Sequence, residues 1–427
     1  MPTARGYLVG ITSLALLTVG RAFGTPGVEQ LGFGLLVLVL IAVGVVRLGR
    51  HDLTVQRRLN PVRVGPGGPV TVTVEVKNEG RGSAPLLLLE DHLPAGLAGS
   101  ARFALHGIEA DGHRSTSFVL RAGRRGSYEV GPLQISFVDP FSLARVRWSA
   151  LGSASFLVHP PVETLAPPRD SGERRSLTSS ARRQPTGARG EDFYTLRDYV
   201  EGDDLRKIHW PATAKRGRYM IRQEETPWHT RATIILDDRA EVHDGYGDVS
   251  SFERAVAAAA SLCDLYARSG YGWRLATACG GGLPVAKGSE HLDRCLDLLA
   301  TVESTRAADE ALLARLAEVE ATGSVEAALV VVTGTLSGEL AVAASRYKRR
   351  FRQVSVISFP AHRFGSQATK SRWGGEQNTR EVMRLLARSD VRGVVLGPDE
   401  SLAIAWSAAG QPRSDREVTW GRRPELV

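Results

Sequence analysis

The chain has 427 residues, of which 43% are hydrophobic and 23% are charged. This is the composition of ordinary globular protein, so collagen-like, fibrous and wholly disordered classes are excluded, and the length predicts about two to three domains. The formal net charge of +8 at pH 7 suits an anionic membrane surface or nucleic acid. The three cysteines have no CxxC or Cys/His spacing, so neither a disulfide framework nor a zinc site is predicted.

Two uncharged, apolar segments, residues 6–20 and 31–46, lie near the amino terminus, and a Gly-Thr-Pro-Gly turn at 24–27 separates them. A helix needs about 20 mostly apolar residues to cross the hydrocarbon of a bilayer, and each segment reaches that length with its flanks. A cleaved signal peptide is the alternative for the first segment, and buried core helices are the alternative for both. Two such segments in direct succession favour a transmembrane helical hairpin over residues 1–50.

Positive charge is distributed unequally around this hairpin. The intervening turn carries one Arg21 and one Glu29, whereas Arg5 precedes the first segment. Five further arginines follow the second segment: Arg47, Arg50, Arg57, Arg58 and Arg63. Because Lys and Arg are enriched in cytoplasmic loops, we expect a two-pass protein of the cell membrane with both termini and all soluble domains in the cytoplasm. Anionic lipid headgroups then account for part of the net charge without a specific nucleic-acid partner.

Residues 51–165 show the two-residue period of half-buried strands. Valines at positions 70, 72, 74 and 76 alternate with polar residues, after a turn rich in Gly and Pro at 65–69. Further short strands are predicted at 85–89, 115–121, 127–130, 133–137 and 155–159. Short strands at this spacing predict an antiparallel β-sandwich. The Arg- and Ser-rich stretch 166–189 that follows has no apolar period, and we interpret it as a solvated linker, with a basic binding strip as the alternative.

From residue 230 to 400, apolar strand-like runs alternate with amphipathic helical patterns. The runs lie at 232–236, 273–278, 327–332, 354–358 and 393–396. This alternation predicts a doubly wound α/β domain, whose parallel sheet is covered by helices on both faces. Three glycines at 280–282 predict a hairpin at its edge, and residues 401–427 are assigned to a carboxy-terminal tail.

The segment 190–229, between the linker and the α/β domain, carries the most distinctive pattern in the chain. Its defining positions are Gly190, Asp192, Phe193, Leu196, Arg197, Tyr199, Gly202, Asp203, Asp204, Arg206, Ile208, Trp210, Ala214 and Lys215. This spacing closely resembles the signature of the bacterial family called domain of unknown function 58, as do Gly131-Pro132 and Asp139-Pro140-Phe141 upstream and the two amino-terminal helices. The resemblance extends over nearly the whole chain and implies that residues 230–400 form a von Willebrand factor A-like domain.

Three roles are open for this signature segment. Asp203 or Asp204 is placed to cap a short helix through Trp210, whose ring is expected to be buried, so the segment can act as a clasp between domains. It can instead be a docking face for another protein, with these candidates: Arg197, Tyr199, Gly202, Asp203, Arg206, Trp210, Lys215 and Arg216. A catalytic or metal site is the third possibility, with these candidates: Asp192, Glu201, Asp203, Asp204 and His209.

The resemblance also implies a place for Mg²⁺, in an Asp-x-Ser-x-Ser loop after the first strand of the α/β domain. Here that strand is followed by Asp-Asp-Arg-Ala-Glu-Val at 237–242. Whether the motif starts at Asp237 or at Asp238, neither of its two Ser positions holds a hydroxyl. Arg239 places a cation beside the site, and a later Asp ligand is missing next to Thr333. We therefore expect a degenerate site at Asp237, Glu241 and Thr333 that holds no metal, and we expect no cofactor.

Other motifs of enzymes are missing from the sequence. It contains no GxxxxGK[ST] phosphate loop and no GxSxG nucleophile elbow. We expect a membrane-anchored, non-enzymatic adaptor that presents a protein-binding α/β domain, and the family resemblance implies a MoxR-type AAA+ ATPase as its partner. The alternative is a membrane-bound, metal-dependent hydrolase that uses the acidic and His cluster of the signature segment. The client and the oligomeric state do not follow from the sequence.

Overall fold

The computed structural model describes residues 2–48, 53–80, 82, 87–94, 96–98, 101–167, 194–198, 208–224, 231–321, 326–348, 350–365 and 375–409. The chain divides into two compact units, Met1–Pro160 and Pro161–Val427. Each unit has its own hydrophobic core.

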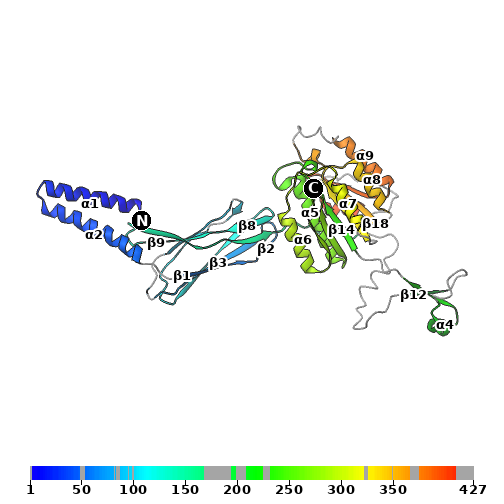
Figure 1. The fold of residues 1–427 in the computed structure, drawn as a ribbon, viewed down its shortest axis with the longest axis horizontal. Helices are drawn as coiled ribbons and strands as arrows, with labels where there is room; N and C mark the ends of the chain where they lie inside the picture. The colour runs from blue at the N-terminus through cyan, green and yellow to red at the C-terminus, as the bar shows by residue number, and fades with distance from the viewer. Residues whose placement is uncertain are drawn as a thin grey trace, which may run out of the picture. The chain divides into compact units, whose positions relative to one another are not determined.

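The first unit begins with two helices that lie side by side, α1 (Ala4–Ala22) and α2 (Pro26–Leu48) (Figure 1). Thr3 caps α1 by accepting a hydrogen bond from the Gly6 N–H, with an N···O distance of 3.1 Å. Within the described part of the chain, one helix has the length and hydropathy needed to cross a membrane, the span Pro26–Arg47 with a mean hydropathy of 2.3. α1 does not meet the same criterion, so this finding supports one of the two expected membrane passes.

The β-rich part of the first unit contains three sheets, in the orders β1-β3-β7-β5, β10-β9-β4-β6 and β2-β11-β8. The two four-stranded sheets share one hydrophobic core, and the four valines predicted to face it, from position 70 to position 76, are fully buried. The bounds of the strands are β1 (Leu53–Asn60), β2 (Arg63–Val64), β3 (Pro69–Asn78), β4 (Leu87–Asp91), β5 (Leu97–Ala98), β6 (Arg102–Leu105), β7 (His113–Ala122), β8 (Gly126–Val130), β9 (Leu133–Val138), β10 (Arg145–Leu151) and β11 (Ala154–Val158).

One pairing departs from the predicted antiparallel sandwich: β2 and β11 are parallel.

A second unpredicted feature is a buried ion pair between Arg57 and Asp91. The Arg57 guanidinium also donates to the carbonyls of Val130 and Gly152, each at 2.8 Å. Burial raises the pKa of Asp91, although the charge and hydrogen bond of Arg57 act in the opposite direction. This arginine therefore connects β1, β4, the end of β8 and the turn between β10 and β11.

The second unit is built on a six-stranded sheet in the order β16-β15-β14-β17-β18-β19, in which β16 is antiparallel and the other neighbours are parallel. One core cluster involves α5, α6 and α10, and a second involves α7, α8 and α9, so helices cover both faces. The strands are β14 (Arg231–Leu236), β15 (Gly272–Thr277), β16 (Gly282–Ala286), β17 (Glu326–Thr333), β18 (Phe351–Ser358) and β19 (Arg392–Val395). The helices are α5 (Ser251–Arg268), α6 (Ser289–Thr301), α7 (Ala311–Ala321), α8 (Gly338–Tyr347), α9 (Gly375–Arg388) and α10 (Leu402–Ala409), with short 3₁₀ turns η2 (Ala240–Val242), η3 (Gly247–Val249) and η4 (Ala361–Arg363).

This sheet confirms the predicted alternation of strands and helices and the edge hairpin at the three glycines, but two predicted boundaries shift. The first unit ends at Pro160 rather than at residue 165, and Leu165 packs in the core of the second unit. Part of the predicted tail is the helix α10, whose Trp406 is 1% exposed and belongs to the same core. The indole N–H of Trp406 donates to the Ala166 carbonyl at 3.1 Å, so both ends of the α/β domain are fixed by contacts that the sequence pattern does not reveal.

The described parts of the signature segment form a small hairpin of their own. β12 (Tyr194–Asp198) pairs antiparallel with β13 (Met220–Glu224), and the short helix α4 (Trp210–Arg216) lies in the connection. Gly217 caps the carboxyl end of α4, and its φ of 68° is the left-handed conformation that favours glycine at this position.

Candidate functional site at the carboxyl edge of the parallel sheet

The strand order of the second unit reverses direction between β14 and β17. The chain places β15 on one side of β14, and then places β17, β18 and β19 on the other. In doubly wound sheets the loops diverge at such a switch point, and ligands bind beyond the carboxyl ends of the strands there. The residues that follow β14 and β17 therefore define the first candidate site.

Asp237 is the central residue of this site and is completely buried. Its carboxylate is held by the guanidinium of Arg239, with 2.8 Å from Nε to Oδ1 and 2.7 Å from Nη2 to Oδ2. The hydroxyl of Thr333, at the end of β17, donates to Oδ2 at 2.7 Å. Burial lowers the pKa of Arg239, but the hydrogen bonds and charge of Asp237 outweigh that effect and raise it, so the guanidinium keeps its charge.

The same arginine reaches a third loop, because its Nη1 donates to the carbonyl of Asp309 at 2.5 Å. Backbone hydrogen bonds reinforce this junction: Thr305 donates to the carbonyl of Asp238, and Ala240 donates to the carbonyl of Thr305. The side chain of Asp238 accepts instead from the Cys279 N–H, in the turn between β15 and β16, at 2.9 Å. The end of β17, residues 305–309 and the turn between β15 and β16 thus all meet the two consecutive aspartates after β14.

His243 closes the loop after β14 and is held in one tautomer. Its Nε2 lies 2.7 Å from the carbonyl oxygen of Asp237, which can only accept, so Nε2 carries the proton. Its Nδ1 accepts from the hydroxyl of Ser251 at 3.1 Å, while that oxygen accepts from the Asp244 N–H. Burial lowers the pKa of His243, and the hydrogen bond to Asp237 only partly offsets this. The ring is therefore neutral at physiological pH.

This arrangement does not fit the Mg²⁺ site that the family resemblance implies. Mg²⁺ requires near-octahedral oxygen coordination, whereas both oxygens of Asp237 accept from Arg239 and one also accepts from Thr333. The structure brings Asp237 and Thr333 together, and it places Glu241 in η2. Among the described residues, no group of three or more His, Cys, Asp or Glu side chains is arranged to hold a metal ion.

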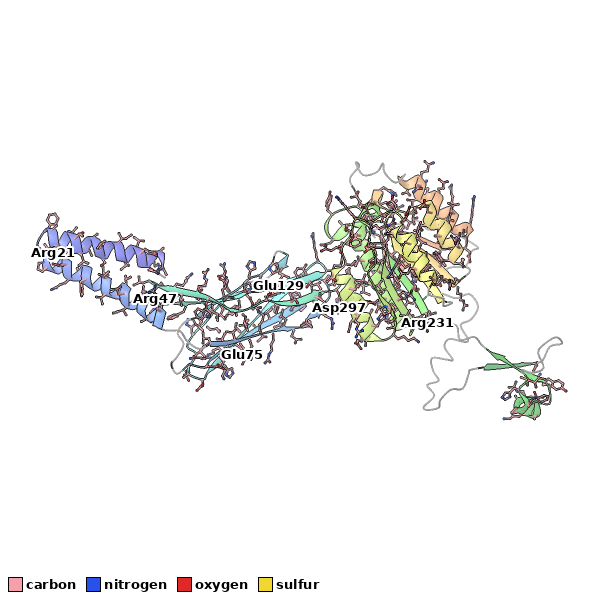
Figure 2. The ribbon with its side chains drawn as sticks, viewed as in Figure 1. Arg21, Arg47, Glu75, Glu129, Arg231 and Asp297 are labelled. Atoms are coloured by element: carbon pink, nitrogen blue, oxygen red, sulfur yellow. The ribbon has the colours of Figure 1, made fainter. Side chains whose placement is uncertain are left out.

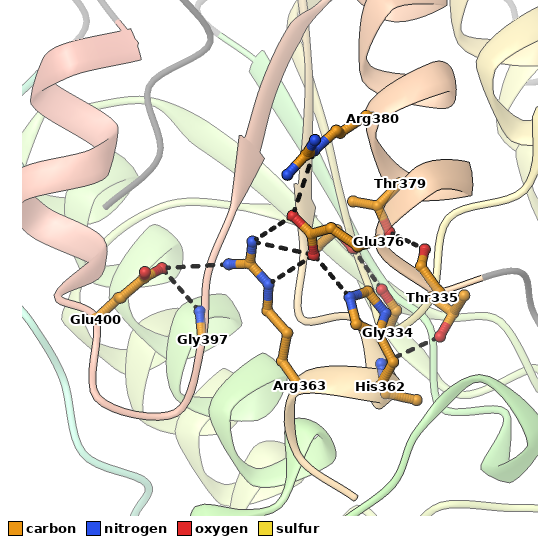
Figure 3. Close-up of polar contacts among 12 residues, drawn as sticks. Gly334, Thr335, His362, Arg363, Glu376, Thr379, Arg380, Gly397 and Glu400 are labelled. Atoms are coloured by element: carbon orange, nitrogen blue, oxygen red, sulfur yellow. Dashed lines mark hydrogen bonds and ion pairs between the residues drawn. The ribbon is translucent and has the colours of Figure 1, made fainter. Parts of the chain in front are cut away.

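A second polar cluster lies at the ends of β18 and β19 (Figure 3). Arg363 in η4 lies between Glu376, at 3.1 Å, and Glu400, at 3.8 Å. His362 lies 2.9 Å from Glu376. Burial raises the pKa of Glu376, but the hydrogen bonds and charges of His362 and Arg363 outweigh burial and lower it, so the carboxylate is ionised. No sequence pattern predicts this cluster, because its members come from separate segments and match no motif.

The residues predicted in the signature segment are placed only in part. Of the docking candidates, Tyr199, Gly202, Asp203 and Arg206 lie outside the described residues, as do Asp192, Glu201 and Asp204 of the catalytic alternative. Arg197 is on β12, in register with Ile221 of β13. Lys215 and Arg216 are exposed in the last turn of α4.

The structure corrects two expectations about α4. The Trp210 ring is exposed, with 64% of its surface accessible, rather than buried. The helix begins at Trp210, and its N-cap is His209, whose Nδ1 accepts from the Ala212 N–H at 3.1 Å. His209 thus has a structural role as a cap, and its Nδ1 lone pair is used there.

The sequence pattern also did not predict the exposed apolar side chains near the switch point. Tyr246 is 92% exposed and Val249 is 60% exposed, and both lie in the loop between β14 and α5. The signal in the sequence is a Tyr between two glycines at 245 and 247, both of which have positive φ. Aromatic side chains held out in this way are typical of protein-binding surfaces.

The family model described as "Protein of unknown function DUF58" matches residues 195–359, from β12 to the end of β18. The match supports the DUF58 family. It covers the signature hairpin and most of the α/β domain, and it does not itself assign a von Willebrand factor A-like fold. No curated protein matches the chain.

The similarities to solved structures are weak. The CARDB domain of a Pyrococcus furiosus protein is 18% identical with a TM-score of 0.19, and the match covers 25% of this chain and 91% of that one. A Pseudomonas fluorescens alkylpurine DNA glycosylase is 12% identical with a TM-score of 0.17, and the match covers 31% and 38% of the two chains. An Archaeoglobus fulgidus cohesin is 14% identical with a TM-score of 0.17, and the match covers 25% and 91%. TM-scores this low support no inference about fold or function.

Proposed function

We propose that this protein is a non-enzymatic adaptor, anchored in the cell membrane by its two amino-terminal helices, that presents the α/β domain and the signature hairpin to a protein partner in the cytoplasm. The observation that carries the proposal is a contrast within the second unit. Asp237, Arg239 and Thr333 at the switch point are bound to one another, whereas large aromatic side chains such as Tyr246 and Trp210 extend into solvent.

The membrane anchor is supported by the burial pattern of α1 and α2, which is the reverse of that in a soluble helix pair. The buried residues of α1 are Gly6, Ser13 and Gly20. Large apolar side chains on both helices are more than half exposed: Tyr7, Leu8, Ile11, Leu14, Leu31, Phe33, Leu40 and Ile41. Helix pairs in lipid pack through small residues, because lipid removes the penalty for exposing apolar side chains. Arg21 and Arg47 lie near opposite ends of the apolar span (Figure 2).

The von Willebrand factor A-like character of the α/β domain is part of this proposal. It is supported by a parallel sheet with one antiparallel edge strand, β16, by helices on both faces, and by an aspartate directly after the first strand. Such a domain offers its carboxyl edge as a binding face, and here Tyr246 and Val249 extend from that edge. Exposed aromatic side chains are the usual hot spots of protein interfaces.

The proposed partner is a MoxR-type AAA+ ATPase, which enters through the family resemblance. The test is purification of the full chain from native membranes with a non-hydrolysable ATP analogue. The ATPase should be recovered with the wild-type chain, and Tyr246→Ala or the double variant Lys215→Glu/Arg216→Glu should lower its recovery by more than about tenfold. Val342→Ala and Arg294→Glu are matched controls, because these side chains are exposed on other helices. Recovery of no ATPase, or equal recovery with all variants, would contradict the proposal.

A further inference from the structure

The switch point contains a buried carboxylate, and a buried carboxylate needs a counter-charge. Asp237 has no exposed surface, and an isolated charge in such a place is strongly unfavourable. In many proteins a divalent cation supplies the balancing charge and joins oxygen ligands from several loops. Here the protein itself supplies the balancing charge, because Arg239 lies two residues after Asp237 in the same loop.

The hydrogen bonds of Asp237 leave its carboxylate no capacity for a metal ion. Oδ1 accepts from Nε of Arg239 at 2.8 Å and from its backbone N–H at 3.4 Å. Oδ2 accepts from Nη2 of Arg239 at 2.7 Å and from the Thr333 hydroxyl at 2.7 Å. A carboxylate has about four lone-pair sites, and all of them are used by these two residues.

The guanidinium also joins separate loops, as a bridging metal ion would. It binds the carboxylate after β14 and the carbonyl of Asp309, and through Asp237 it is joined to Thr333 at the end of β17. We propose that Arg239 is a built-in cation, which takes the place of a divalent metal ion at the switch point and keeps the binding edge formed without one. A partner that binds this edge then does so without a shared metal, whichever protein it is.

The test uses the full chain in detergent micelles, with Mn²⁺ as the probe. Wild-type protein should bind no Mn²⁺ by electron paramagnetic resonance, and hydrogen exchange at residues 237–243 and 333–336 should be the same in Mn²⁺ and in chelator. In chelator, Arg239→Ser should speed exchange in these segments by about tenfold or more, because the carboxylate has lost its counter-charge. Added Mn²⁺ should restore the slow exchange, and Arg239→Ser/Asp237→Asn should show no Mn²⁺ response.

Two further variants complete the design. Arg239→Lys keeps the positive charge without the planar fork and should still exclude Mn²⁺. Arg268→Ser, which removes a half-exposed arginine paired with Asp264 on α5, should change nothing at the switch point. Binding of Mn²⁺ by wild-type protein that is lost in Asp237→Asn would overturn the proposal. It would also be overturned if Arg239→Ser exchanged like wild type in chelator, or if Mn²⁺ failed to restore its slow exchange. These readouts do not involve the ATPase, so they stand or fall separately from the proposed function.

Discussion

At the scale of single residues, Trp210 shows how a distinctive motif differs from a core position. A large ring in a long signature suggests burial, yet it is 64% exposed on a seven-residue helix. Substitution of an exposed side chain usually changes the free energy of unfolding by less than about 0.5 kcal/mol. We therefore expect Trp210→Ala to leave the denaturation curve of the full chain almost unchanged while it weakens partner recovery. A buried ring would instead cost about 3–5 kcal/mol, and a loss of that size would place Trp210 in an interdomain clasp.

His243 gives a prediction about pH. Burial lowers its folded-state pKa below the usual value, whereas the imidazole in the unfolded chain has a pKa of about 6.5. Below that pH, His243 is protonated in the unfolded state but stays neutral in the folded state until its lower pKa is reached. Stability should therefore fall as the pH drops below about 6.5, with a slope of at most about 1.4 kcal/mol per pH unit from this group, until the folded pKa is reached.

The measurement is denaturant unfolding of the α/β domain in the full chain between neutral and mildly acidic pH, followed through the fluorescence of the buried Trp273 and Trp406. His243→Gln, which cannot titrate, should flatten the slope in this interval. His362→Gln is the matched control, because it removes a histidine from the second polar cluster of the same domain. An equally steep slope in His243→Gln would show that another group controls the acid response.

The switch point shows what sequence can and cannot predict at this scale. The missing hydroxyls and the cation at Arg239 are visible in six consecutive letters, and they predict an altered site. The contact of Arg239 with Asp309, and that of Thr333 with Asp237, depend on how three loops that are distant in the sequence meet. No local pattern encodes that meeting, so the role of the arginine follows only from the fold.

At the scale of elements, the turn at Asp139-Pro140-Phe141 explains a motif that the sequence could only associate with a family. The Asp139 carboxylate accepts from the N–H groups of Phe141 and Ala144, at 2.9 and 2.5 Å. The turn so formed accepts the start of the chain, because Thr3 donates to the carbonyl of Leu143 at 2.8 Å. A Cβ at Gly6 would lie 2.0 Å from that carbonyl oxygen. The motif therefore attaches the base of the helical pair to the sheets of the first unit.

Strand prediction succeeded where burial alternates and failed where charge hides it. The β3 strand alternates almost perfectly and was found, while β1 carries two arginines in succession, at 57 and 58, and was missed. Arg57 is a core residue there, since its side chain is 3% exposed and paired with Asp91. A sequence pattern counts an arginine as polar surface, so a buried ion pair removes the very signal on which strand prediction depends.

The packing of α1 against α2 gives a prediction for Gly32. A Cβ at this position would lie 2.9 Å from the Leu17 backbone nitrogen and 3.0 Å from the Ser13 carbonyl oxygen. Ser13 also donates its hydroxyl to the Gly32 carbonyl at 2.7 Å. Gly32→Leu should therefore separate the helices, at a cost of about 1–3 kcal/mol for overpacking, and should speed hydrogen exchange in both. Gly34→Leu is the matched control, because a Cβ on Gly34 would meet no neighbouring group within 4 Å. Equal exchange in the two variants would contradict close helix packing.

At the scale of the whole molecule, the division between the β-sheets of the first unit and the α/β fold of the second was predictable, because each has its own hydrophobic period. The boundary was not, since residues 161–167 continue the sandwich in sequence but pack with the second unit. Glu163 shows why: its carboxylate accepts from the Ser401 hydroxyl at 2.9 Å and from the Ala403 N–H at 3.0 Å, so it caps α10 from far away in sequence. Long-range caps of this kind set domain limits that composition cannot locate.

The last prediction concerns the orientation of the molecule in the membrane. The test introduces cysteines at Thr25, between the helices, and at Ser180, beyond the second helix. A membrane-impermeant maleimide should label position 25 in intact cells and leave position 180 unlabelled, because the flanking arginines favour the cytoplasm. The native thiols should stay silent. Cys263 and Cys295 are buried, and burial and the hydrogen bond with Asp238 raise the pKa of Cys279 to about 12, which leaves little reactive thiolate at neutral pH. Permeabilised cells provide the control in which Ser180 becomes reactive. Labelling of Ser180 in intact cells would place the soluble units outside, where no cytoplasmic ATPase can reach them, and protection of both positions would exclude an exposed turn and with it the two-pass anchor.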